Sequence, residues 1–73
     1  MNTVEEQITL LARQLKARRK HLQITQTELA DLAGVSLTFV VQLEKGKQTV
    51  ALNKMLAVVA ALGLATKLEI ANA

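Results

Sequence analysis

Apolar side chains recur every three or four residues in the first third of the chain, which is the spacing of an amphipathic helix. The residues on this stripe are Ile8, Leu11, Ala12 and Leu15. Thr3 and Glu6, just before the stripe, have the spacing of a capping box, in which a hydroxyl and a carboxylate bind the first free amide groups of a helix. We therefore predict a first helix, about Val4–Leu22.

Two shorter helices are predicted in the middle of the chain, one on each side of Gly34. Thr25 and Glu28 repeat the capping-box spacing and start the first of these helices, Gln26–Ala33. Gly34 then stands where a helix ends in a left-handed residue, a conformation that favours glycine. The second of the two helices is predicted over about Leu37–Lys45.

These two helices have the spacing of a helix-turn-helix. Ser36 offers a capping hydroxyl to the second helix, and Gly46 ends it. Ala30 is small at a position where the two helices must approach each other closely. Such a pair suits DNA, because an α-helix fits the major groove while the helix before it lies across the backbone.

A fourth helix is predicted over about Leu52–Leu62, and Gly63 ends it. Its expected core face consists of Leu52, Met55, Leu56, Val59 and Leu62. Beyond Gly63 the pattern changes to period two, with Leu64, Leu68 and Ile70 on one side and Lys67 and Glu69 on the other. Alternation of this kind predicts a short strand.

The predicted fold is therefore all-α, a compact domain of four to five helices with a short C-terminal β-strand. We divide the chain into a DNA-binding domain over residues 1–63 and a dimerisation strand within residues 64–73. A lone strand has no sheet partner in a helical subunit, so its amide groups require a second chain. A homodimer is expected for this reason.

Composition excludes most chemistry. The 73 residues include no cysteine, one histidine and no tyrosine or tryptophan, so we expect no disulfide, no metal site, no cofactor and no enzyme. The net charge of +3 favours an acidic partner such as nucleic acid. The longest apolar run, Met55–Ala65, is shorter than the roughly 18 residues of a membrane span. With no basic, apolar signal pattern at the N-terminus, a cytoplasmic protein is expected.

The stretch Leu15–Leu64 resembles the Xre/Cro-type helix-turn-helix repressors of phages and bacteria. The segments that carry the resemblance are Arg19-Lys20, Ile24-Thr25-Gln26, Glu28-Leu29-Ala30, Ala33-Gly34-Val35-Ser36, Val40, Leu43-Glu44-Lys45-Gly46-Lys47 and Ala61-Leu62-Gly63. The resemblance implies a phage-repressor-like fold. It also implies a repressor that inserts the helix Leu37–Lys45 into the major groove of a palindromic operator.

Residue roles follow from the same resemblance. The base-contacting positions fall on Leu37, Thr38 and Gln42. The phosphate-contacting positions fall on Thr25, Gln26, Lys45, Lys47, Gln48 and Thr49. In the family, the glutamine at the place of Gln26 also braces a recognition side chain, and a structural ion pair corresponds to Arg19 and Glu44. Leu37 and Val41 depart from the family, where polar residues are common, which shifts the expected readout to Gln42 and to DNA shape.

A second feature indicates dimerisation. Ala57 and Ala60 stand where relatives are usually charged, and Val58 lies beside them, so the apolar surface of the fourth helix exceeds the face that one core needs. The expected dimer interface consists of Val58, Leu64, Thr66, Leu68 and Ile70.

The region 62–70 is also similar to HipB-type antitoxins, in which a single helix-turn-helix module ends in a short amphipathic strand. That similarity implies a HipA-type kinase toxin as a partner, repression of the module's own operon, and association with the nucleoid when the operator is bound. The alternatives left open are a stand-alone Xre/Cro-type repressor, phage-derived or chromosomal, and a protein-interaction module that has lost DNA binding. Steep salt dependence would separate DNA binding from a hydrophobic protein interface.

Overall fold

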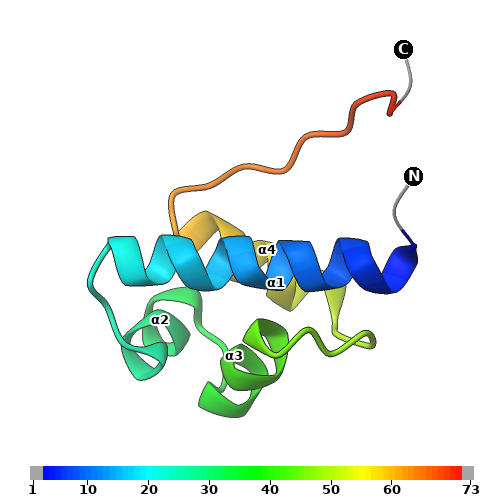
Figure 1. The fold of residues 1–73 in the computed structure, drawn as a ribbon. Coiled ribbons are helices and arrows are strands. Elements are labelled where there is room, and N and C mark those ends of the chain that lie inside the picture. Colours follow the sequence, from blue (N-terminus) through cyan, green and yellow to red (C-terminus); the bar gives the residue numbers. More distant parts are fainter. Residues whose placement is uncertain (1–2, 72–73) are drawn as a thin grey trace.

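A computed structural model describes residues 3–71 and consists of four helices (Figure 1). They are α1 (Val4–His21), α2 (Gln26–Ala33), α3 (Leu37–Glu44) and α4 (Leu52–Ala61). The described residues include no β-strand. The prediction of an all-helical domain with four helices is confirmed. Each predicted helix begins at its expected residue, and α1, α3 and α4 end one residue early.

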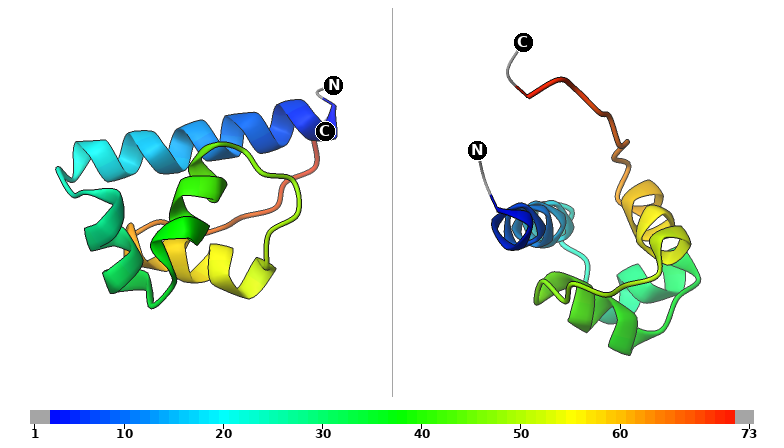
Figure 2. Two further views of the ribbon diagram at one scale, coloured as in Figure 1. Left: turned by 90° about the horizontal axis from the view of Figure 1, so that it is seen from below. Right: turned by 90° about the vertical axis from the view of Figure 1, so that its right-hand side faces the viewer.

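The long helix α1 lies across one side of the molecule, with α2 and α3 together on one side of it (Figure 1). Helix α4 packs against α2, and α3 packs against both α1 and α2. The C-terminal segment leaves α4 and runs on the opposite side of α1 from α3 (Figures 1 and 2). Helix α3 and the C-terminal segment are thus on opposite sides of the subunit.

Local side-chain bonds explain where the helices start. Both predicted capping boxes are present: the hydroxyl of Thr3 accepts from the amide of Glu6, and that of Thr25 accepts from the amide of Glu28. In each box the glutamate carboxylate accepts a bond from the amide of its threonine. Ser36 caps α3 through its hydroxyl, whereas α4 begins without any side-chain cap.

The core lies where the four helices meet. Its buried side chains are Leu15, Leu29, Ala30, Val40, Leu43, Val58, Val59 and Leu62. Leu29 of α2 and Val40 of α3 are completely buried in this core. The same side chains therefore pack the two short helices against each other and against the rest of the domain. Burial of this kind holds the two short helices at a fixed angle.

The predicted face of α4 is wrong in part. Val58 is only 1% exposed and belongs to the core of its own subunit, so it offers no surface to a second chain. Leu52 and Leu56, which we assigned to the core, are exposed instead. Helix α4 is apolar almost all round, so its sequence has no polar face that fixes which side turns inward. Contact with α2 decides the rotation.

The predicted C-terminal strand does not form within one subunit. The last backbone hydrogen bond before the segment joins the amide of Leu64 to the carbonyl of Val59, and residues 65–70 make none with the described part of the chain. An extended segment becomes a strand only beside another strand, and the described part of the chain provides no such neighbour. Pairing with a second subunit therefore remains a prediction.

Candidate nucleic-acid interface

The turn between α2 and α3 is set by two short-range features. Gly34 adopts a left-handed backbone, with φ of 70°, and this lets the amide of Val35 reach the carbonyl of Ala30 at 3.1 Å. Ser36 Oγ then accepts from the amide of Phe39 at 3.0 Å. Because each bond fixes the chain next to a helix end, the direction of α3 relative to α2 follows from these residues.

Helix α3 presents two distinct faces. Val40 and Leu43 point into the core, as predicted. The opposite face consists of four residues at helical spacing, which we call the reading stripe: Leu37, Thr38, Val41 and Gln42. Leu37 and Thr38 are exposed, while Val41 and Gln42 are half-buried. The three residues expected to contact bases therefore share one accessible face of one helix.

Glu44, at the end of α3, joins three helices. Its Oε2 accepts from Arg19 Nε at 2.7 Å, and its Oε1 accepts from Arg19 Nη2 at 3.0 Å. Gln26 Nε2 donates to the same Oε1 at 3.1 Å. The side chains of Arg19 and Glu44 are only 10% and 4% exposed, so water competes little for these bonds. The expected pair of Arg19 and Glu44 is present in the structure and is bidentate.

The guanidinium of Arg19 also donates from Nη1 to the carbonyl of Ile24 at 2.9 Å, in the loop before α2. Hydrogen bonding to Glu44 raises the pKa of Arg19 above its ordinary value, against the opposing effect of burial. A raised pKa means that the charged form is favoured in the folded state. Arg19 is therefore protonated at every pH at which duplex DNA is stable, and the pair does not respond to pH through this residue.

The observed partner of Gln26 differs from the one expected. We expected its amide to brace a recognition side chain. It donates instead to Glu44, the acidic residue of the ion pair with Arg19. The bond places the first residue of α2 beside the last residue of α3. The phosphate-binding residues expected at the start of α2 are therefore close to those that follow α3.

A second amide on this surface is also oriented. Lys47 Nζ donates to Gln42 Oε1 at 3.3 Å, and the amide of Lys47 donates to the carbonyl of Gln42 at 3.1 Å. The side-chain oxygen of Gln42 thus faces Lys47, and its Nε2 has no hydrogen-bond partner among the described residues. Gln42 therefore presents two N–H donors to the exterior.

The other expected phosphate contacts lie near the C-terminal end of α3, because Gln26 binds Glu44 and the lysines and polar residues after α3 follow Glu44 in the chain. Thr25 is exposed, and because its hydroxyl accepts a bond from Glu28, its proton remains available to a phosphate oxygen. Lys45 caps the end of α3. Four exposed residues follow the stripe: Lys45, Lys47, Gln48 and Thr49. Cationic and polar donors beside an exposed helix can bind phosphates at the border of a groove.

Arg18 has a structural role that the sequence did not indicate. Its Nε donates to the carbonyl of Leu62 at 3.0 Å, so it binds the C-terminal end of α4. Within the basic run of α1 nothing distinguishes Arg18 from its neighbours, because its partner is 44 residues away. Spacing along the chain gives no signal for such a bond.

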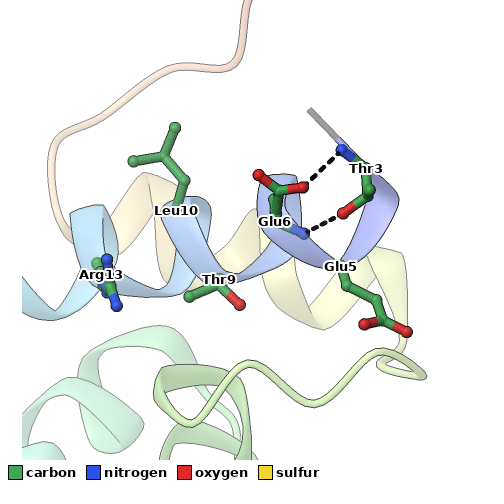
Figure 3. Close-up of a pocket in the computed structure, with 6 residues that line it drawn as sticks. All are labelled: Thr3, Glu5, Glu6, Thr9, Leu10 and Arg13. Atoms are coloured by element: carbon green, nitrogen blue, oxygen red, sulfur yellow. Dashed lines mark hydrogen bonds between the residues drawn. The ribbon is translucent and has the colours of Figure 1, made fainter. Parts of the chain in front are cut away.

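The described residues offer little sign of a metal, membrane or ligand site elsewhere. They contain no cluster of three metal-ligating side chains, and no helix among them is long and apolar enough to cross a membrane. An open hollow of about 660 Å³ lies along the first half of α1 (Figure 3). Thr3 and Glu6, which line it, already bind each other as a capping box. Because these two side chains are engaged with each other, we assign no binding site to the hollow.

Comparison with known proteins gives two findings. Residues 15–68 match the family described as Helix-turn-helix, a range that contains all of α2, α3 and α4. A segment of 45 residues is 49% identical to the uncharacterized HTH-type transcriptional regulator y4mF of Sinorhizobium fredii (strain NBRC 101917 / NGR234). The similar segment covers 62% of this chain and 59% of that protein, so it spans about three fifths of the relative's length.

Proposed function

The chain belongs to the helix-turn-helix family, and from this premise we propose that it is a DNA-binding transcription regulator whose helix α3 enters the major groove. The observation that carries the proposal is the reading stripe on α3, which the core does not use and which has exposed polar donors near its C-terminal end. The 49% identical relative is itself named a transcriptional regulator.

Each group on this surface has a role in the proposal. Leu37, Thr38 and Gln42 contact base edges, since they project from the exposed face of α3. The donors around the stripe bind phosphates: Thr25, Gln26, Lys45, Lys47, Gln48 and Thr49. Glu44 contacts no DNA; with Arg19 it holds α1, α2 and α3 in the arrangement that brings the two sets together.

We also propose that two copies act together through the C-terminal segment. Leu68 is 99% exposed and Ile70 is nearly as exposed, which is unfavourable for large apolar side chains with no partner. A groove of about 490 Å³ is lined by residues of this segment, α1 and α4. Leu11, Leu64 and Leu68 line it and provide apolar surface that a second chain can cover.

The segment is self-complementary in one register. If two copies pair antiparallel about a two-fold axis at Leu68, each Lys67 lies opposite the partner subunit's Glu69, and Thr66 lies opposite the partner subunit's Ile70. Both cross-strand ion pairs then share one face of the ribbon, and Leu64, Thr66, Leu68 and Ile70 share the other. Alternate residues of the segment find backbone hydrogen-bond partners in the same step, since every second residue of an antiparallel pair directs its amide at the other strand.

The proposed ribbon is compatible with DNA binding, because the C-terminal segment and α3 lie on opposite sides of α1 (Figure 1). Val58 is not part of this interface, since it is buried in its own subunit. Two reading stripes related by a two-fold axis and about 34 Å apart would read a palindromic operator.

Within this function we propose the role of antitoxin in a HipBA-type module, on the resemblance of residues 62–70 to HipB-type proteins. In that role the protein represses its own operon in the cytoplasm, on the nucleoid, and binds a HipA-type kinase toxin. A stand-alone Xre/Cro-type repressor is the alternative, since the reading stripe and the proposed ribbon serve both equally.

A binding titration tests the DNA-binding proposal. Lys45 and Lys47 from both subunits of a dimer would neutralise four phosphates, which predicts a slope of about −3.6 for log affinity against log salt. Affinity for duplex DNA should then fall on the order of 10²-fold between about 50 and 200 mM salt. A flat salt dependence would favour the protein-interaction module instead.

Purification of the chain from its native cells, with nuclease added, tests the antitoxin role. A stoichiometric kinase-like partner supports the antitoxin. Self-association without any such partner, with DNA fragments recovered when the nuclease is omitted, supports the stand-alone repressor.

A further inference from the structure

Helix α3 carries no basic side chain. Its sequence is LTFVVQLE, and its one charged residue, Glu44, is occupied by Arg19 and Gln26. The first lysine after it, Lys45, caps the end of the helix, one turn beyond Val41. Arginine or lysine bound to guanine O6 and N7 is the commonest base contact in the major groove. The residues of α3 that face outward cannot make it.

The reading stripe offers apolar atoms in its place. Leu37 is 46% exposed although leucine usually packs in a core, and the core beneath α3 is already filled by Val40 and Leu43. Val41 lies one helical turn from Leu37 on the same side, and the methyl group of Thr38 adjoins them. In the major groove only thymine presents a matching apolar group, its C5-methyl.

The amide of Gln42 completes the stripe. Its Nε2 is open to the exterior, and Lys47 occupies only one of the two lone pairs of Oε1. A glutamine in this state can donate to adenine N7 and accept from adenine N6, which is the preferred bidentate contact of this side chain. Lys47 acts as a positioning residue because it sets which end of the amide faces outward.

We propose that the reading stripe recognises A·T base pairs, with Leu37, Thr38 and Val41 against thymine methyl groups and Gln42 on an adenine edge. This inference rests on the proposed DNA-binding function and adds the chemistry of its target. It predicts half-sites whose specified positions are A·T pairs, and it assigns no guanine contact to α3.

Replacing single thymines by deoxyuridine tests the inference, because it removes the C5-methyl group and keeps base pairing. The full chain is first used to select its preferred duplex from a random pool. Each thymine of that duplex is then replaced in turn. We expect about a fourfold loss of affinity at one or more positions in each half-site, since a buried methyl group contributes roughly that factor.

The variant Leu37→Ala identifies the side chain. It should bind the thymine and deoxyuridine duplexes equally at the position that Leu37 covers. Leu10→Ala is the matched control: Leu10 is 48% exposed, lies on α1 and points away from α2 and α3 (Figure 3). It should keep the full thymine effect. Both leucines are exposed, so both variants should fold, and their circular dichroism melts check this.

The outcomes separate the inference from the function on which it rests. A selected duplex in which every thymine can be replaced without loss overturns the inference alone. So does a Leu37→Ala chain that still distinguishes thymine from deoxyuridine at every sensitive position. The inference is also overturned if the specified positions of the selected duplex are G·C pairs and if replacing guanine by 7-deazaguanine lowers the affinity. A chain that binds no duplex at all overturns the proposed function and the inference together.

Discussion

At the scale of single residues, the carboxylate of Glu44 has the most demanding environment in the domain. It accepts three hydrogen bonds, two from Arg19 and one from Gln26, while almost completely buried. Burying a charge is unfavourable unless its partners compensate, so removal of one partner costs more than the lost bond itself. The position of Gln26, and with it one proposed phosphate contact, depends on the same carboxylate.

Arg19→Ala should lower the free energy of unfolding by about 3–5 kcal/mol, because it leaves Glu44 buried without its counterion. Urea denaturation of the purified chain measures the change. Arg13→Ala, an exposed arginine on the same helix, is the control and should change stability by less than about 0.5 kcal/mol. Equal stability of the two variants would mean that the pair contributes nothing to the fold.

Substitutions of Gln42 and of Lys47 should lower DNA affinity in different ways. Gln42→Ala should weaken binding to the selected duplex by about 1–3 kcal/mol and leave binding to random duplex unchanged, because it removes a base contact. Lys47→Ala should weaken both and reduce the salt slope by about one for each lysine lost. Titrations at several salt concentrations distinguish them. Equal losses on both duplexes for Gln42→Ala would remove it from the base contacts.

At the scale of elements, the sequence predicted the helices well because their starts depend on local bonds. The capping boxes of Thr3 and Thr25 join residues three apart, a distance that a sequence pattern reports directly. The rotation of α4 could not be predicted in this way. Leu56 and Val58 are equally apolar, and only contact with α2 determines which of them is buried.

At the candidate site, hydrogen bonds between residues far apart in the chain could not be predicted from the sequence for the same reason. The reading stripe followed from helical spacing, and the Arg19–Glu44 pair from family resemblance. The bond from Gln26 to Glu44 spans 18 residues. No periodicity along the chain could have indicated it.

The start of α4 offers a stabilising substitution. Ala51 occupies the capping position with extended backbone angles and makes no side-chain cap. Ala51→Ser should therefore raise the free energy of unfolding by about 1 kcal/mol. Ala60→Ser, inside the same helix, is the control and should lower it slightly, since serine is a poorer helix former. Urea denaturation compares the two, and a loss of stability in Ala51→Ser would contradict the cap geometry.

At the scale of the whole molecule, the subunit has one surface for each proposed task. Helix α3, which carries the reading stripe, lies on one side of α1, and the extended C-terminal segment lies on the other (Figure 1). The segment has exposed leucine and isoleucine side chains, and its residues 65–70 have no backbone hydrogen-bond partner among residues 3–71. In the proposed dimer, pairing with a second subunit covers these apolar side chains and provides backbone hydrogen bonds to the segment.

Truncation of residues 68–73 should lower dimer affinity and operator affinity together, because both depend on the ribbon in this account. Sedimentation equilibrium measures the dimer, and a titration with the selected duplex measures operator binding. A truncated chain that remains fully dimeric would refute the pairing of the C-terminal segments.

A charge exchange tests the register. Lys67→Glu should weaken the dimer by roughly fivefold at low salt, because it places two carboxylates opposite each other twice in each ribbon. Lys67 and Glu69 also pair within one subunit, with Nζ and Oε1 3.2 Å apart, so the rescue must act between chains. Mixing Lys67→Glu chains with Glu69→Lys chains should restore dimer affinity, because each carboxylate then lies opposite a lysine of the partner strand. If the mixture is as weak as the single variants, the axis does not pass through Leu68.

Selection from a random duplex pool shows whether two α3 helices read one palindrome. It should be performed with the wild-type chain and with the double variant Leu37→Ala, Gln42→Ala. The wild type should enrich an inverted repeat whose half-sites are about 10 base pairs apart from centre to centre, and the variant should not enrich it. No enrichment by the wild type, or the same repeat enriched by the variant, would contradict the account.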